Sequence, residues 1–224
     1  TTISEHLIMV CLMLLRRQME YTEIIRAGGW ETLPGGIRSL HGARITVLGT
    51  GDIGTEFARR AQAFHPACIT GVRRTVRSSD PAFTSIHAIA ELDSVLPETD
   101  LLVMALPSTA ETVGILSRER IALLPDSAFV VNVGRGTAID QEALCDALNA
   151  GRLAGAALDV VVPEPLPADH PLRRAKNLLL TPHVAGNMTL GYTCDKSVQM
   201  FCDDLENYAA GRPLAHLVDR KRGY

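Results

Sequence analysis

The sequence predicts an α/β fold built around a parallel, doubly wound sheet. Apolar segments of strand length alternate with segments of helical periodicity along most of the 224 residues. Residues 100–105 form a nearly continuous apolar run, which is typical of a strand covered on both faces. A glycine-rich turn links the first expected strand to a helix, as the connections between parallel strands require.

The chain begins with an expected helix over residues 4–27. Ser4 is its candidate N-cap, and the two glycines at 28–29 form its candidate C-cap. The apolar run 7–15 lacks the positive start and cleavage site of a signal peptide. It is also shorter than the ~20 apolar residues that span a bilayer, so we expect a buried helix without contact to a membrane.

Regular alternation follows a connector over residues 30–42. Strands are expected at residues 44–48, 68–72, 85–86, 100–105, 128–133, 154–158 and 177–180. Five helices are expected after the first strand. One follows the glycine-rich turn and runs through residue 64, and the others cover residues 88–95, residues 117–124, the segment from the Asp140 N-cap to residue 150, and residues 189–210. We divide the chain into a dinucleotide-binding domain, residues 1–188, and a C-terminal helix and tail, residues 189–224.

Composition favours a soluble globular protein. Hydrophobic residues make up 46% of the chain and charged residues 21%. A net charge of −3 gives no indication of nucleic acid or an acidic membrane as a partner. The 5 cysteines are scattered without a CxxC pair or metal-ligand spacing, so we expect buried thiols, no metal and a reducing, cytoplasmic location.

The glycine-rich turn has the GxGxxG pattern of a Rossmann-type dinucleotide site. Gly49 permits the tight turn, Gly51 lets the backbone approach a pyrophosphate, and Gly54 lets the helix pack closely on the strand. Asp52 and Ile53 begin the helix, whose N-terminal N–H groups favour an anion. The alternative is a glycine turn with a packing role only.

The end of the second expected strand indicates which dinucleotide binds. NAD-binding sites usually carry an acid there for the ribose hydroxyls. This chain has Arg73, Arg74 and Thr75 instead. Guanidinium groups suit a 2′-phosphate, so we expect NADP(H) to be preferred, with NAD(H) possible. The alternative is that both arginines form a solvated surface pair.

Three side chains with catalytic chemistry follow apolar runs in the second half. Arg135 can hold a carboxylate with two hydrogen bonds, although it can also be a turn residue between two glycines. His183 can give and take a proton, and Glu164 can orient its ring. The other six histidines are expected to be structural or solvated, four of them in connectors without partners.

These segments resemble the D-isomer-specific 2-hydroxyacid dehydrogenases. The resemblance covers almost the whole chain and rests on residues 49–54, 105–112, 132–136, 158–166 and 181–183. It implies that Arg135 anchors the substrate carboxylate, that His183 is the general acid/base and that Glu164 is its partner. It also implies the following cofactor contacts: Asp159 on the nicotinamide carboxamide, Leu106, Pro107 and Val133 around the nicotinamide, and further contacts from Thr112, Gly134, Arg135, His183, Ala185 and Gly186.

The chain departs from the family's pattern in its first part. Members carry a flavodoxin-like substrate domain, which we expect to be largely missing here, while residues 189–224 resemble the helix and tail that return to it. We therefore expect poor turnover from these 224 residues alone. Family members also dimerise through the cofactor domain, and Met9 and Met13 offer an apolar surface for a homodimer.

The sequence therefore predicts an oxidoreductase. Hydride would pass between NAD(P)H and C2 of a small 2-oxo or 2-hydroxy acid of the D series, with glyoxylate and hydroxypyruvate as first candidates. The alternative is a nucleotide-sensing, corepressor-like binding protein of the same fold, which would need no turnover.

Overall fold

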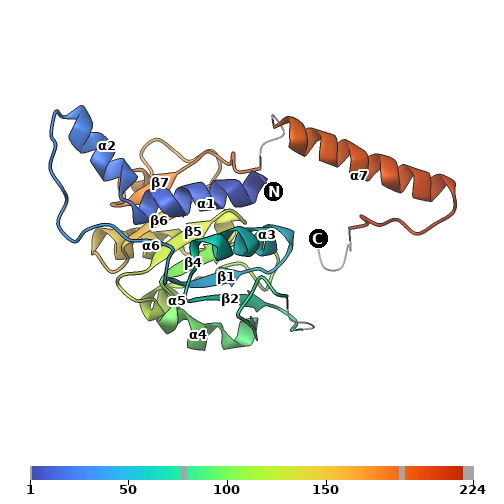
Figure 1. Cartoon of the computed structure of the whole chain (residues 1–224), viewed down its shortest axis with the longest axis horizontal. Coiled ribbons are helices and arrows are strands. Elements are labelled where there is room, and N and C mark those ends of the chain that lie inside the picture. The colour runs from blue at the N-terminus through green and yellow to red at the C-terminus, as the bar shows by residue number, and fades with distance from the viewer. Residues whose placement is uncertain (1, 77–79, 187–189, 219–224) are drawn as a thin grey trace.

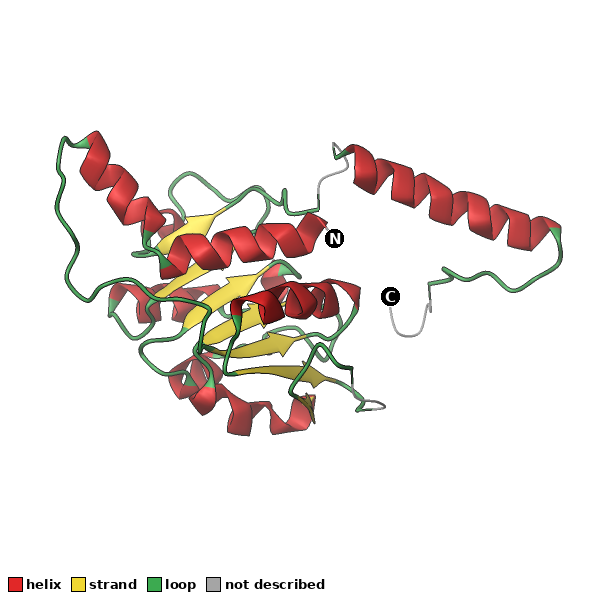
Figure 2. Ribbon diagram, viewed as in Figure 1, coloured by secondary structure: helices red, strands yellow, loops and turns green. Residues whose placement is uncertain are grey.

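The computed structural model describes residues 2–76, 80–186 and 190–218. A 7-stranded parallel sheet in the order β3-β2-β1-β4-β5-β6-β7 forms its centre (Figures 1 and 2). The strands are β1 (Arg44–Leu48), β2 (Cys68–Arg73), β3 (Ser85–Ala88), β4 (Leu101–Met104), β5 (Phe129–Asn132), β6 (Gly155–Leu158) and β7 (Leu178–Leu180). All seven expected strands are confirmed. The chain order reverses between β1 and β4, and the crevice at this switch point is where open α/β sheets bind ligands.

Helices cover both faces of the sheet, as Figure 1 shows for α1 and α3 on one side and α4 and α5 on the other. Alternate residues of β4 enter separate cores: Leu102 and Met104 join one, and Leu101 and Val103 the other. The helices are α1 (Thr2–Leu15), α2 (Gln18–Arg26), α3 (Asp52–Ala61), α4 (Leu92–Val95), α5 (Arg118–Leu123), α6 (Gln141–Asn149) and α7 (Gly191–Ala209). Short 3-10 turns are η1 (Gln62–Phe64), η2 (Ile89–Glu91), η3 (Leu96–Glu98), η4 (Gly136–Ala138) and η5 (Pro171–Arg174).

The first expected helix is in fact two. Arg17 has a φ of 54°, which breaks the helix between α1 and α2. Its guanidinium donates to the Glu20 carboxylate and, over 2.6 Å, to the Pro34 carbonyl oxygen, so a distant segment stabilises the turn. The predicted Ser4 N-cap is wrong, because α1 begins at Thr2 and Ser4 lies buried inside it.

The end of α2 agrees with the prediction. The Gly28 N–H donates to the Ile25 carbonyl and the Gly29 N–H to the Ile24 carbonyl, and Gly28 has a φ of 83°. This is the Schellman arrangement, for which glycine at the left-handed position is preferred. By contrast, the helix predicted over residues 88–95 begins too early, because Ala88 ends β3.

One face of the apolar run in α1 is buried, as predicted, while Met9 on the same helix is exposed. Leu7, Val10, Cys11 and Leu14 are at most 4% exposed. Within the described ranges, no helix combines the length and apolarity that a membrane span requires. Among the described residues, there is also no group of His, Cys, Asp or Glu side chains arranged for a metal ion.

The final helix, α7, is largely exposed along its whole length, and α2 likewise has no buried residue. Of the predicted range 189–210, residue 189 lies outside the described residues, and none of the residues of α7 is buried. Figure 1 shows α7 standing away from the sheet. Val198, Phe201, Leu205 and Tyr208 repeat at helical spacing and are 54–75% exposed.

The cysteines only partly match the prediction. All five are free, but Cys194 and Cys202 are exposed on α7 and Cys68 is half-buried. Only Cys11 and Cys145 are the buried thiols that were expected. Burial raises the pKa of the Cys11 thiol far above its usual range.

Candidate active site

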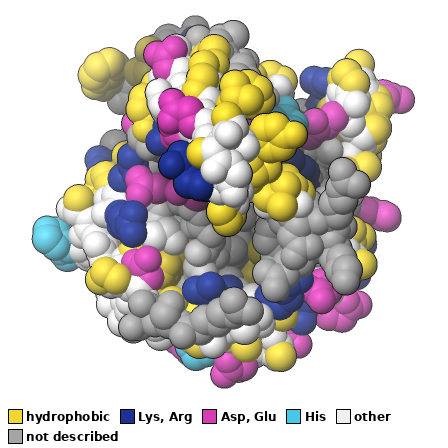
Figure 3. Space-filling view, turned by 90° about the vertical axis from the view of Figure 1, so that its right-hand side faces the viewer, with side chains coloured by type: hydrophobic (Ala, Val, Ile, Leu, Met, Phe, Trp, Pro, Cys, Tyr) yellow, Lys and Arg dark blue, Asp and Glu magenta, His cyan; other side chains and the backbone are white. Residues whose placement is uncertain are grey.

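The predicted site residues follow the carboxyl ends of the strands. Figure 3 looks onto this end of the molecule, where basic, acidic and hydrophobic side chains are interspersed on the part of the surface that is not grey. Loops after β1, β2, β4, β5, β6 and β7 meet here because parallel strands all end at the same edge.

The glycine loop after β1 is closed on one side and open on the other. Gly49 has a φ of 104°, and a Cβ added there would lie 2.7 Å from the Ala105 carbonyl oxygen. At Gly54 the added atom would lie 2.0 Å from the Gly49 carbonyl oxygen. At Gly51, the N-cap of α3, it would meet nothing within 4 Å. Gly54 is therefore a packing glycine, and Gly51 leaves room for a ligand to approach the backbone.

This loop fits the phosphates of a dinucleotide. The first-turn N–H groups of a helix, here those beginning with Asp52 and Ile53, have no acceptor within the helix. They give the N-terminus of α3 a positive partial charge, and no atom of the described residues lies within 4 Å of a Cβ added at Gly51.

The loop after β5 carries Arg135 and is fixed by Asn132. The Asn132 side chain is buried, and its Oδ1 accepts from the Gly134 N–H over 2.9 Å. Its Nδ2 donates to the Arg135 carbonyl oxygen over 3.0 Å. Sequence reasoning missed this amide, although an asparagine that ends an apolar strand before glycine is typical of an Asx turn.

Two close approaches lock the same loop between its neighbours. A Cβ at Gly134 would lie 2.5 Å from the Leu106 carbonyl oxygen, and one at Gly136 would lie 2.4 Å from the Val161 carbonyl carbon. Arg135 itself is exposed, and its Nη1 donates to the Gly134 carbonyl oxygen over 2.7 Å. Among the described residues it has no carboxylate partner, so its charge is available to a ligand.

The loop after β7 is organised by Asp159, which is 4% exposed. Its carboxylate accepts from Thr181 Oγ1 over 2.5 Å, from the Val184 N–H over 2.9 Å and from the Ala185 N–H over 3.0 Å. Its carbonyl oxygen accepts from the His183 N–H over 2.9 Å. His183 has a φ of 55°, a left-handed conformation that these bonds stabilise.

Glu164 and His183 form the expected contact. His183 Nδ1 lies 2.8 Å from Glu164 Oε2, and Glu164 Oε1 accepts from the Val161 N–H over 3.0 Å. Partial burial raises the pKa of Glu164, but the hydrogen bonds from His183 and Val161 outweigh it and lower that pKa below its usual value. An ionised Glu164 requires a proton on Nδ1, which leaves Nε2 of the exposed ring to exchange a proton with a ligand.

A pocket of about 590 Å³ lies beside this pair. Asp159, Glu164, Thr181 and His183 line it together with Arg173, whereas Arg135 does not line it. Sequence reasoning missed Thr181 and Arg173. The Arg173 guanidinium donates to the carbonyl oxygens of Leu166 and Pro167 in the proline-rich loop that precedes it.

His87 and His170 have partners, contrary to the prediction that they lie in connectors without them, and His6, expected to be structural or solvated, also makes a contact. His6 Nε2 lies 3.4 Å from Thr181 Oγ1. His87 lies in β3 with its Nδ1 3.6 Å from Glu91 Oε1. His170 Nδ1 accepts from the Leu172 N–H and caps η5.

Arg74, the second of the two arginines at the end of β2, contacts an acid that the sequence did not indicate. Arg73 ends β2 and is half-buried, while Arg74 and Thr75 are exposed. The Arg74 Nη1 lies 3.2 Å from Glu111 Oε2, in the loop after β4. Local reasoning excluded a carboxylate at this position, but the fold supplies one from 37 residues away.

The remaining predicted cofactor contacts line the same edge. Thr112 is buried, and its Oγ1 donates to the Pro107 carbonyl oxygen over 2.6 Å, which shapes the loop after β4. Leu106 and Val133 are each 8% exposed. Ala185 is buried and Gly186 is exposed.

Comparisons with known proteins agree with this geometry. The model of the D-isomer specific 2-hydroxyacid dehydrogenase NAD binding domain matches residues 8–185. A glyoxylate/hydroxypyruvate reductase B of Pectobacterium carotovorum is 36% identical over 190 residues, which cover 82% of this chain and 58% of the relative. This chain therefore spans less than two thirds of that relative's length.

Two solved structures are also similar. A D-isomer specific 2-hydroxyacid dehydrogenase from Xanthobacter autotrophicus, bound to NADPH and MES, has a TM-score of 0.87 at 31% identity, covering 100% of this chain and 89% of its own. An NADPH-dependent glyoxylate/hydroxypyruvate reductase from Sinorhizobium meliloti, bound to NADP and sulfate, has a TM-score of 0.89 at 28% identity, covering 100% and 69%. The chain belongs to the D-isomer specific 2-hydroxyacid dehydrogenase family, and residues 8–185 correspond to its NAD binding domain.

Proposed function

We propose that the protein is an NAD(P)-dependent oxidoreductase that reduces a small 2-oxo acid to the D-2-hydroxy acid, or catalyses the reverse reaction. The observation that carries this proposal is the 2.8 Å contact between His183 Nδ1 and Glu164 Oε2, beside a glycine loop open at Gly51. Relatives named glyoxylate/hydroxypyruvate reductase support glyoxylate and hydroxypyruvate as the candidate substrates. They also favour an enzyme over the corepressor-like alternative.

Each site residue then has a specific role. Arg135 binds the substrate carboxylate, because its exposed guanidinium is fixed by a tight loop and has no carboxylate partner among the described residues. His183 Nε2 gives the proton to the forming C2 alkoxide, or removes it in the reverse direction. Glu164 holds the ring and stabilises the imidazolium. When bound, the nicotinamide supplies or accepts the hydride at C2.

The cofactor is assigned to the loops at the carboxyl ends of the parallel strands. Gly51, Asp52 and Ile53 bind the pyrophosphate, while Gly49 permits the turn and Gly54 lets α3 pack against it. Arg73, Arg74 and Thr75 bind a 2′-phosphate, so NADP(H) is preferred. The residues around the nicotinamide are Leu106, Pro107, Thr112, Val133, Gly134, Asp159, Ala185 and Gly186. The buried Asp159 carboxylate already accepts three hydrogen bonds, so it acts mainly by holding the His183 loop.

We also propose that residues 1–188 form the cofactor domain, and that α7 and the tail pack against a substrate domain of the kind the family carries. The exposed apolar stripe on α7 supports this assignment. Met9 is 46% exposed on α1, which supports a homodimer through the cofactor domain. The free thiols are typical of a cytoplasmic protein.

Calorimetric titration of the 224-residue chain with NADPH and NADH tests the cofactor site. We expect both to bind and NADPH to bind more tightly, and Arg73→Asp to reverse the preference. Equal or tighter NADH binding would contradict the NADP preference alone. If neither dinucleotide bound to the folded chain, the proposed cofactor site would be wrong.

A further inference from the structure

The ion pair between Arg74 and Glu111 crosses the expected cofactor site. Arg74 follows β2 and Glu111 lies in the loop after β4, while β1 lies between these two strands in the sheet. The 3.2 Å contact from Arg74 Nη1 to Glu111 Oε2 therefore joins loops on both sides of the strand that leads into Gly49 and Gly51. A dinucleotide held by the glycine loop would lie next to this contact.

The loop presents Glu111 in a fixed position. Thr112 Oγ1 accepts from the Thr109 N–H over 2.8 Å and donates to the Pro107 carbonyl oxygen over 2.6 Å. The Gly114 N–H donates to the Thr137 carbonyl oxygen over 2.8 Å. These bonds fix the backbone on either side of Glu111, from which its side chain reaches Arg74.

The contact can be displaced. The Arg74 and Glu111 side chains are 39% and 61% exposed, and ion pairs between exposed side chains contribute little to stability. A phosphate carries up to two negative charges and three acceptor oxygens, and it binds a guanidinium more strongly than one carboxylate does. A 2′-phosphate would thus replace Glu111 on Arg74, whereas a 2′-hydroxyl would not.

We propose that Glu111 is a specificity-determining residue that competes with the 2′-phosphate of NADP(H) for Arg74. This inference rests on the proposed cofactor site. Glu111 makes NADPH binding weaker by holding the Arg74 guanidinium that would otherwise bind the 2′-phosphate. It leaves NADH binding unchanged, so it narrows the preference for NADPH that Arg73 and Arg74 create.

The variant Glu111→Gln tests the competition, because glutamine keeps the shape and removes the charge. Calorimetry should give about two- to fivefold tighter NADPH binding, the size expected for one exposed ion pair, with NADH affinity within about twofold of wild type. The matched control is Glu98→Gln. Glu98 also pairs with an arginine, Arg44, but at the amino end of the sheet, so both affinities should stay unchanged. Circular dichroism and melting curves check that each variant is folded.

A double-mutant cycle separates competition for Arg74 from general charge repulsion. Arg74→Met should weaken NADPH binding about tenfold through the loss of a charge-assisted hydrogen bond. In that background Glu111→Gln should have no further effect. The proposal is overturned if the gain persists without Arg74, if Glu111→Gln leaves NADPH affinity unchanged, or if it weakens NADPH binding. These comparisons require that the wild-type chain binds NADPH. If the folded wild-type chain bound neither NADPH nor NADH, the proposed function and this inference would both be overturned.

Discussion

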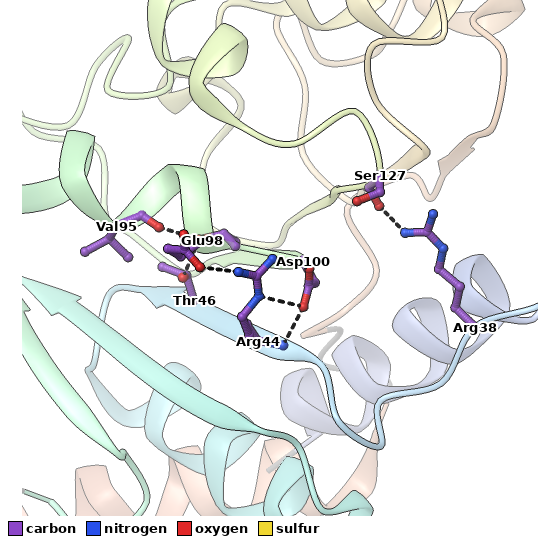
Figure 4. A network of polar contacts seen from close by, with 8 residues as sticks. Arg38, Arg44, Thr46, Val95, Glu98, Asp100 and Ser127 are labelled. Carbon is purple, nitrogen blue, oxygen red and sulfur yellow. Dashed lines mark hydrogen bonds and ion pairs between the residues drawn. The ribbon is translucent and has the colours of Figure 1, made fainter.

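The two ends of the sheet each have a hydrogen-bonded aspartate, but with different partners. At the amino end, Asp100 accepts from the Arg44 backbone N–H over 2.8 Å and from the Arg44 guanidinium, which also contacts Glu98 (Figure 4). At the carboxyl end, the partners of the Asp159 carboxylate among the described residues are a hydroxyl and two backbone N–H groups. At the amino end Asp100 and Glu98 thus share the Arg44 guanidinium, while the carboxyl end keeps the charge of Arg135 available for a ligand. Substitutions at the two ends should therefore affect different properties.

The largest effect is expected from His183→Ala at the carboxyl end. Loss of the general acid/base should lower kcat for NADPH-dependent reduction of glyoxylate by about 10²- to 10⁴-fold. Melting temperature and NADPH affinity should change little, because the His183 ring is exposed and 50% of its side chain faces solvent. Steady-state kinetics of the protein together with its substrate domain measure this loss of kcat, and Glu98→Gln serves as the control variant. A loss smaller than tenfold would exclude His183 from proton transfer.

Two glycines in one loop should give opposite results. Gly54→Ala places a Cβ against a backbone oxygen that cannot move away cheaply, and should lower the free energy of unfolding by about 3 kcal/mol. Gly51→Ala meets open space and should change stability by no more than about 0.5 kcal/mol. It should nevertheless weaken NADPH binding about tenfold, since the methyl group occupies the approach to the backbone. Urea unfolding and calorimetry on both variants check this, and equal stability losses would contradict the assignment of roles.

The sequence was informative where local pattern and fold agree. The strands were found from apolar runs, and the contact between Glu164 and His183 followed from both residues succeeding strands of one parallel sheet. The break at Arg17 could not be predicted, because arginine is a good helix former and the bond that stabilises the turn comes from Pro34. Glu111 was missed for a similar reason, since its partner lies 37 residues away. Non-local polar contacts leave no periodic signal in a single sequence.

Asp159→Asn tests how far neutral donors hold the catalytic loop. Oδ1 accepts from the Val184 N–H and Oδ2 from the Ala185 N–H, so either orientation of the amide would place its NH₂ against a backbone donor. We expect a loss of about 2 kcal/mol in the free energy of unfolding, because a buried N–H loses its acceptor. Hydrogen exchange at Val184 and Ala185 should become faster. Thr181→Val, which removes only the hydroxyl donor, should cost less, and unchanged exchange in Asp159→Asn would contradict the proposed role of Asp159.

Asp100→Asn should have the smallest effect, and that effect should depend on pH. The hydrogen bonds from the Arg44 guanidinium, partly offset by burial, lower the pKa of Asp100 below its usual value. A lowered pKa in the folded state means that the ionised carboxylate stabilises the fold above the unfolded pKa of about 4. This contribution is lost as the pH falls through the lower, folded pKa. Wild type should therefore exceed the variant by about 1 kcal/mol near pH 7, because the pair is partly exposed and Arg44 can still contact Glu98.

The same difference should shrink steadily between about pH 5 and pH 2, and urea unfolding at several pH values measures it. NADPH affinity at pH 7 should be unchanged in Asp100→Asn, since the residue lies at the end of the sheet opposite the glycine loop. A stability difference that stayed constant with pH would mean that the Asp100 charge contributes nothing and that only its hydrogen-bond geometry matters. The amino end would then hold its strands in the same way as the carboxyl end holds its loop, and the contrast between charged and neutral partners would disappear.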